Sequence, residues 1–69
     1  MKEIKITTDF IKLDSFLKLS GAVSTGGHAK IVITSGEVKV NGEICTMRGK
    51  KLRLGDTVEF SSNSYKIVQ

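Results

Sequence analysis

The side chains of this chain that are best suited to chemistry are positively charged and cluster in one segment. Between residues 47 and 53 the sequence MRGKKLR holds Arg48, Lys50, Lys51 and Arg53 and no acidic residue. The 69-residue chain has 11 lysines and arginines against 7 acids, a formal net charge of +4. On so small a surface this excess favours polyanionic partners. A charge run is also typical of a solvated loop, and the sequence leaves both interpretations open.

A glycine pair offers a second candidate site. Gly26 and Gly27 stand at the start of a candidate helix, where unobstructed amides and the positive end of the helix dipole can seat a phosphate. Simple turn geometry is the alternative explanation for such a pair. The chain contains no GxxxxGK[ST] motif of a nucleotide-binding P-loop. His28, the single histidine, has no ligand partner at metal-binding spacing, so we expect a surface side chain that can hydrogen-bond a phosphate.

The remaining reactive side chain is Cys45, the single cysteine. It cannot form an internal disulfide, which is typical of a cytoplasmic chain, and it has no neighbouring base, so we expect it to pack rather than react. No catalytic set, metal motif or cofactor motif is visible, which predicts a protein that is not an enzyme. The longest apolar run spans only residues 31–33, and the N-terminus alternates charged and apolar residues. Neither a secretion signal nor a membrane span is therefore expected.

The elements that must position these residues can be predicted from apolar periodicity. EIKIT at residues 3–7 alternates with period two and predicts a strand. A helix is expected over residues 10–19, capped by Thr8 or Asp9 and stopped by Gly21. The apolar stripe of this helix comprises Phe10, Leu13, Phe16 and Leu17.

A second helix is expected in the segment GGHAKIVITSG, although IVIT would also suit a strand. Its buried face comprises Ala29, Val32 and Ile33, which have helical spacing. Ser24 or Thr25 stands where a cap belongs, and Gly36 where a helix ends in the left-handed conformation. Ile31 points away from the buried face, and the helix assignment does not explain it.

The segment after the second helix changes to period two and carries a hairpin signal at residues 41–42, Asn-Gly. A two-residue loop would mix apolar and charged side chains on each face of the hairpin. A three-residue loop would place Val38 opposite Ile44 on the core side and Lys39 opposite Glu43 outside. The sequence therefore favours the three-residue loop, with its glycine left-handed in a bulge.

Three further short strands are expected, with turns between them. They are KLRL at 51–54, TVEF at 57–60 and YKIV at 65–68, separated by Gly55-Asp56 and by SSNS. The whole pattern predicts a single domain over residues 1–69. Its fold class is α+β, with two short helices packed on a small mixed β-sheet that includes a β-hairpin.

This order of elements resembles the RNA-binding domain of the ribosomal protein S-four type, also called the alpha-L motif. The residues that carry the resemblance are Lys12-Leu13-Asp14 with Leu17, then Gly21, Ala29, Gly36 with Val38, Val40, Asn41 and Gly42, and finally Gly55-Asp56. It covers about residues 9–60, with a lysine at position 12 where the common form has arginine. The STGGHAK form, in place of the family's Ser-Arg start of helix two, is similar to the stand-alone bacterial YaaA/YbcJ-like subgroup.

The resemblance implies that the protein binds structured RNA, either ribosomal RNA or transfer RNA, or a ribosomal subunit. We also expect a monomer without a cofactor or a metal. A-form RNA can be selected through its shape and its 2′-hydroxyls without base reading. The residues expected to bind RNA are Lys12, Lys18, Gly26, Gly27, His28, Lys30, Lys39, Arg48, Lys50, Lys51 and Arg53. The three phenylalanines fit the core or strands, which leaves Tyr65 as the candidate for base stacking.

Two alternatives belong to other functional classes. A small protein-interaction module can use an exposed sheet edge, although the sequence shows no large apolar patch. A β-grasp sulfur carrier is suggested by VNGE and LRLGDTVEF, but such carriers need a C-terminal Gly-Gly and this sequence ends YKIVQ. The carrier is therefore disfavoured.

Overall fold

Short elements make up the whole chain. The computed structural model describes residues 1–69, with seven strands and two helices. In chain order they are β1 (Lys2–Lys5), β2 (Ile11–Lys12), α1 (Leu13–Leu19), α2 (Gly26–Thr34), β3 (Val38–Val40), β4 (Glu43–Ile44), β5 (Lys51–Leu52), β6 (Thr57–Phe60) and β7 (Asn63–Val68). Neither helix has the length and apolar character that crossing a membrane requires.

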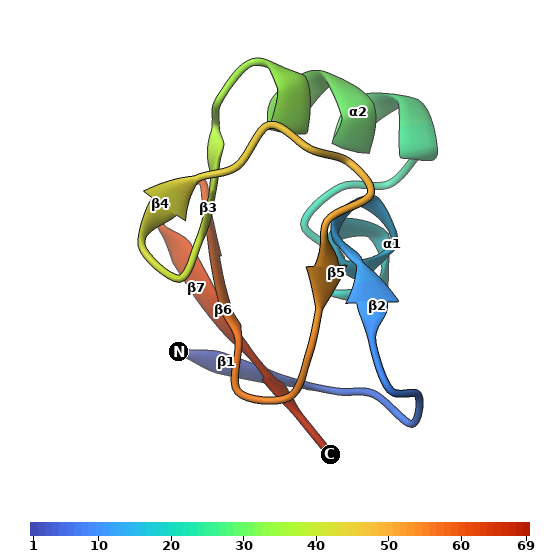
Figure 1. The fold of residues 1–69 in the computed structure, drawn as a ribbon. Helices are drawn as coiled ribbons and strands as arrows, with labels where there is room; N and C mark the ends of the chain where they lie inside the picture. The colour runs from blue at the N-terminus through green and yellow to red at the C-terminus, as the bar shows by residue number, and fades with distance from the viewer.

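Five strands form one mixed sheet in the order β1-β7-β6-β3-β4. β1 runs parallel to β7, and the other pairings in this sheet are antiparallel. β2 and β5 form a separate antiparallel ribbon. This ribbon and α1 stand beside the main sheet, and α2 lies across one end of the molecule (Figure 1). The α+β class predicted from the sequence, with two helices, a mixed sheet and a hairpin, is confirmed.

α2 buries the whole apolar face that its periodicity predicts, whereas α1 buries the predicted stripe without Phe10, which lies before the helix and is half-buried. The buried helical side chains are Leu13, Phe16 and Leu17 of α1 and Ala29, Val32 and Ile33 of α2. Phe16 meets Tyr65 of β7 edge-to-face, with ring centroids 6.0 Å apart. Such aromatic pairs add to the stabilisation that comes from area burial. The core thus joins α1 to the centre of the main sheet.

The prediction for α2 is confirmed at both ends. The Thr25 side chain accepts a hydrogen bond from the amide of His28 at 3.1 Å, as an N-cap residue does. Gly36 has a φ of 81°, in the left-handed region that favours glycine after a helix. The side chain of Ile31 is 63% exposed, so the residue that the helical wheel left unexplained points into solvent.

The prediction that the first helix begins at Phe10, capped by Thr8 or Asp9, is wrong. α1 begins at Leu13, and the Thr8 hydroxyl donates to the carbonyl of Phe10 at 2.8 Å. The residue in the N-cap position, Lys12, makes no side-chain cap. The chain before the helix instead pairs as β2 with β5, and this long-range pairing overrides the local helical pattern.

The predicted register of the β3–β4 hairpin is also wrong. Lys39 lies opposite Ile44, and Val40 opposite Glu43, which leaves a two-residue loop. The loop residues have φ values of 51° for Asn41 and 86° for the glycine that follows, as a type I′ turn requires. The alternation of apolar and polar residues could not predict this register, because both residues of β4 are exposed and neither side of β4 packs on the core.

The other strands differ from prediction mainly in length. β1 begins at Lys2 and ends at Lys5, so predicted residues 6–7 lie outside it, although Ile6 is still buried. KLRL contributes only Lys51–Leu52 to a strand, while TVEF is β6 as predicted. Residues 61–62 form the turn after β6, both with positive φ, and β7 therefore starts at Asn63, earlier than expected.

Candidate nucleic-acid interface

The β2–β5 ribbon brings positive charges from two distant segments together. Lys12 and Lys51 are direct partners across the ribbon. Arg53 follows two residues after Lys51, and since side chains on the same side of an extended chain recur every second residue, both point the same way. All three side chains are exposed. The pairing thus creates a positive surface that neither segment has alone.

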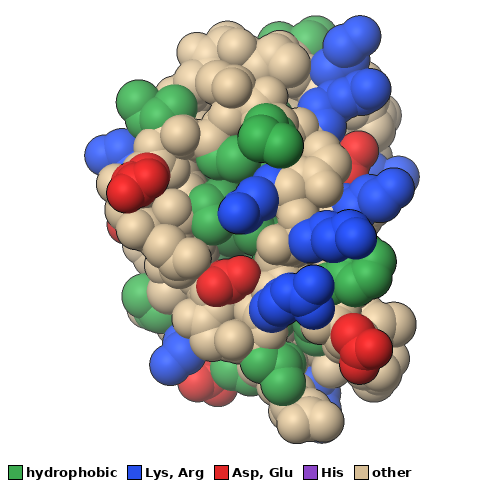
Figure 2. Space-filling view, viewed as in Figure 1, with side chains coloured by type: hydrophobic (Ala, Val, Ile, Leu, Met, Phe, Trp, Pro, Cys, Tyr) green, Lys and Arg blue, Asp and Glu red, His purple; other side chains and the backbone are tan.

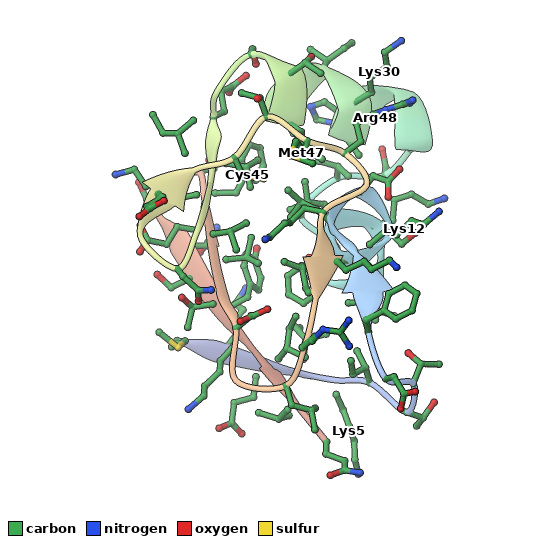
Figure 3. The ribbon with its side chains drawn as sticks, in the orientation of Figure 1. Lys5, Lys12, Lys30, Cys45, Met47 and Arg48 are labelled. Atoms are coloured by element: carbon green, nitrogen blue, oxygen red, sulfur yellow. The ribbon has the colours of Figure 1, made fainter.

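The loop between β4 and β5 extends this surface toward α2. The first two amides of α1, on Leu13 and Asp14, donate to the carbonyls of Lys50 and Arg48 at 2.9 and 3.1 Å. These bonds satisfy amides that a helix start leaves unpaired, and they fix the loop against the helix. Figure 3 shows Arg48 beside Lys30 of α2, with Lys12 further along the same side.

We call these five exposed cations the basic column: Lys12, Lys30, Arg48, Lys51 and Arg53. Figure 2 shows Lys and Arg side chains running down one side of this face of the molecule. The loop sequence contains no acid. The fold nevertheless brings Asp14 to the border of the column, because the backbone amide of Asp14 donates to the backbone carbonyl of Arg48. The column remains predominantly positive.

An aromatic ring that the sequence pattern did not predict lies within the column. The Nζ of Lys51 lies 4.8 Å from the centroid of the Phe10 ring, and the Cζ of Arg53 lies 5.8 Å from it. Both distances fit cation–π contacts. The short alternation from Phe10 to Leu13, with Ile11 half-buried and Leu13 buried, was the available signal for a strand with an outward-facing ring.

Three other expected residues adjoin the column. Gly26 and Gly27 lie one helical turn before Lys30, on the side of α2 that faces the same way. Lys18 lies one turn after Asp14 on α1. The structure therefore places these residues at the edges of the basic column.

The glycine pair at the start of α2 is not required by the backbone. Neither Gly26 nor Gly27 has a positive φ, and a Cβ at either position would meet no atom within 4 Å. The amide of His28 donates a hydrogen bond to the Thr25 hydroxyl, and the amide of Ala29 donates to the Thr25 carbonyl. The two glycines thus leave open space around the first turn of the helix.

Two expected RNA-binding residues are separated from the column. Lys39 of β3 is the register partner of Glu59, and it lines a polar hollow that also includes Glu37 and Glu59. His28 lies two residues before Lys30 on α2, so the two side chains do not lie on the same side of the helix. The structure therefore does not join either residue to the other cations.

The expectation that Tyr65 could stack on a base is wrong. Its side chain is only 3% exposed because it packs against Phe16 in the core. Cys45 is half-buried, and its thiol approaches the carbonyl of Met47 at 3.8 Å. No group of three or more His, Cys, Asp or Glu side chains is placed to hold a metal ion.

The geometry defines a class of protein: a small α+β domain that presents a rigid row of cations, suited to an anionic polymer. Residues 4–68 match the S4 domain family, and the chain belongs to this family. It is 42% identical over 66 residues to the "Probable ribosome maturation protein RlbA" of Bacillus subtilis (strain 168), covering 94% of this chain and 93% of that protein. It is 40% identical over 58 residues to YbcJ of Escherichia coli (strain K12), covering 84% and 83% of the two chains.

Solved structures show the same fold. The solution structure of YbcJ from E. coli, described as having an alpha-L motif involved in RNA-binding, aligns with a TM-score of 0.76 and 34% identity. That alignment covers 100% of this chain and 89% of YbcJ. The 30S ribosomal protein S4e of Thermoplasma acidophilum aligns with a TM-score of 0.66 over 87% of this chain and 32% of that protein. At 22% identity, this second likeness concerns the fold alone.

Proposed function

We propose that this protein binds structured RNA through the basic column and catalyses no reaction. The observation that carries the proposal is the β2–β5 pairing, which places Lys12 beside Lys51 and aligns them with the cations of α2 and the β4–β5 loop. Phosphate contacts need positive side chains at fixed positions on a firm surface. Paired strands and the hydrogen-bonded loop provide that surface.

Structured RNA is favoured over single strands for a physical reason. Proteins that bind single strands without sequence preference combine a basic groove with several exposed aromatic side chains. Here Phe16 and Tyr65 are buried, and Phe10 is the one aromatic ring within the column. A row of cations with a single ring suits the regular phosphate spacing of a duplex, which proteins recognise mainly by shape and 2′-hydroxyl contacts.

The relatives support a ribosomal RNA or a ribosomal particle as the partner, in the cytoplasm. RlbA is named as a ribosome maturation protein and aligns over nearly the full length of both chains. YbcJ is described as carrying an RNA-binding motif, and it shares this fold. The site contains exposed cations and backbone amides rather than a nucleophile with a base, so the proposed role is binding.

The proposal is tested with three substitutions that change the net charge equally. Lys30→Glu alters the part of the basic column on α2, and Lys51→Glu alters the part on the β2–β5 ribbon. Lys66→Glu alters an exposed position on β7, outside the column. Affinity for a fully paired RNA hairpin is measured by filter binding at one salt concentration, and circular dichroism checks the fold. We expect each column variant to lose about three- to tenfold in affinity, and Lys66→Glu less than about twofold.

The same assay separates the proposal from its rivals. Equal losses for all three variants would mean general attraction to a positive protein rather than a localised site. No loss for any of them would favour the protein-interaction alternative. A DNA hairpin of the same sequence is the control for nucleic-acid type, and we expect weaker binding because DNA lacks the 2′-hydroxyl and A-form shape.

A further inference from the structure

A groove lies beside the basic column, between the β3–β4 hairpin and the loop that follows it. Its volume is about 400 Å³, within the range of small-ligand sites. The lining residues are Val40, Asn41, Glu43, Ile44, Cys45, Thr46, Met47 and Lys50, and we call this the hairpin groove. Figure 2 shows a hollow on the face that carries the column, with hydrophobic side chains along its wall.

The apolar part of the hairpin groove is exposed and shaped by flexible side chains. Met47 is 64% exposed and Ile44 is 62% exposed, and half-buried Cys45 lies between them in sequence. Figure 3 shows Cys45 and Met47 close together on the loop that crosses from β4 toward β5. A thioether makes favourable contacts with aromatic rings and adapts to their position. The wall can therefore accept a flat aromatic group.

The polar part of the groove differs in charge from the basic column. It holds one cation, Lys50, one acid, Glu43, and the hydroxyl of Thr46. A carboxylate repels phosphate, whereas it accepts hydrogen bonds from the exocyclic amino groups of adenine and cytosine. The column suits a phosphate backbone and the groove suits the edge and face of a base.

The two surfaces are adjacent along the chain. Lys50 lines the groove, and the next residue, Lys51, belongs to the column. The groove and the column therefore share a border at these two residues, and one nucleotide can place its phosphate at the column and its base in the groove. The carbonyl of Lys50 is fixed by the amide of Leu13 at 2.9 Å, which holds this junction in place.

We propose that the hairpin groove receives one unpaired nucleobase of the bound RNA, with the base against Met47 and Ile44. The proposal rests on the RNA binding proposed above and deepens it, because the preferred RNA is then a helix interrupted by an unpaired nucleotide. Unpaired bases in loops and bulges are those that proteins can splay out and contact individually. A fully paired helix would use the column alone.

The test uses two RNA hairpins with the same stem and the same loop, one with a fully paired stem and one whose stem carries a single bulged adenosine, so that they differ only in the bulge. We expect the protein to bind the bulged hairpin about tenfold more tightly, since contact with one base face contributes on this scale. Met47→Ser should reduce that ratio to less than about threefold and leave affinity for the paired hairpin unchanged. Leu54→Ser is the matched control, because Leu54 is exposed in a turn outside the groove.

A second measurement reports on the groove directly. Cys45 is the only thiol in the chain and lines the groove, so its rate of alkylation by iodoacetamide measures access to that site. We expect the bulged hairpin to slow the reaction several-fold at saturation, and the paired hairpin at saturation to leave it nearly unchanged. Wild-type and Leu54→Ser proteins should behave alike.

Several outcomes would overturn the proposal. An affinity ratio near one in the wild type, or a ratio that survives Met47→Ser, would show that no base enters the groove. Equal protection of Cys45 by both hairpins would have the same meaning. Self-association that Met47→Ser abolishes would assign the groove to a second copy of the chain. If neither hairpin binds at all, the proposed function itself fails, which is distinct from paired RNA binding without a bulge preference.

Discussion

The Nζ of Lys51 lies 4.8 Å from the centroid of the Phe10 ring, and this contact joins the residue that precedes β2 to a basic-column residue on β5. Arg53 approaches the same ring at 5.8 Å. A ring that attracts both cations restricts side chains that would otherwise sample many rotamers. Restricting them before binding lowers the entropy lost when they contact phosphates. Phe10 is therefore a positioning residue of the proposed interface.

Replacing Phe10 by leucine should weaken RNA binding while the fold persists. Exposed cation–π contacts contribute about 0.5–1 kcal/mol, so we expect a two- to fivefold loss of affinity for a paired hairpin. Phe60→Leu is the control, because Phe60 is also half-buried but lies on β6, in the polar hollow with Lys39. Thermal unfolding of both variants shows whether a loss of affinity reflects a loss of folded protein. Equal losses of affinity would contradict a positioning role for Phe10.

Binding should depend strongly on salt. The basic column and its neighbours can neutralise about four to six phosphates, so log affinity plotted against log salt should have a slope of about −3 to −5. The slope is measured by repeating the filter-binding assay over a series of potassium chloride concentrations. Lys51→Glu should make it shallower by about one. A slope near zero for the wild type would rule out backbone contacts as the source of affinity.

Leu17→Ala should destabilise the protein by about 2–5 kcal/mol. The side chain is fully buried in the core, and a small core cannot collapse to fill the cavity. Chemical denaturation measures the loss of unfolding free energy. Leu19→Ala removes the same atoms from a side chain that is 57% exposed, and it should cost less than about 1 kcal/mol. Similar costs for both variants would place the buried face of α1 incorrectly.

Much of the fold is predictable from the sequence because its signals are local. The α2 cap at Thr25, the left-handed Gly36 and the buried stripe of α1 each depend on residues within one or two turns. The start of α1 was mispredicted for the opposite reason. Phe10 has helical spacing with Leu13, but pairing of Ile11–Lys12 with β5, about forty residues away, decides its conformation.

The candidate site, like the fold, is predictable only where it depends on residues that are close in sequence. The cations of the β4–β5 loop are visible as a cluster in the sequence, but their alignment with Lys12 depends on the ribbon, and with Lys30 on the packing of α2. The positive charge of Lys39 suggested an RNA contact, but the sequence could not predict that its register partner on β6 is the acidic residue Glu59. The hairpin groove could not be predicted from the sequence, because it forms only where the β3–β4 hairpin lies beside the β4–β5 loop.

Gly27→Ala should separate the two explanations of the glycine pair. No positive φ and no crowding require glycine at this position, so alanine should stabilise the protein by about 0.5–1 kcal/mol. If a phosphate approaches the first turn of α2 closely, the added methyl group should lower RNA affinity several-fold. Thermal unfolding and filter binding measure the two effects. Higher stability with unchanged affinity would show that the glycines make no RNA contact.

The type I′ turn of the β3–β4 hairpin allows the strand register to be tested by substitution at Asn41. Asn41 has a φ of 51°. Its side-chain oxygen accepts from the amide and the hydroxyl of Thr57 at 2.9 and 3.3 Å, and its side-chain nitrogen donates to Asp56 at 3.2 Å. Asn41→Gly keeps the left-handed backbone accessible and loses only these bonds, so we expect a cost of about 0.5–1.5 kcal/mol.

Asn41→Ala loses the same bonds and must also hold a Cβ in the left-handed region, which adds about 1–2 kcal/mol. The difference between the two variants, measured by urea denaturation, therefore reports the backbone conformation alone. A three-residue loop with only Gly42 left-handed would not require positive φ at Asn41. In that case alanine would be no worse than glycine at position 41, and the observed pairing of Lys39 with Ile44 would be contradicted.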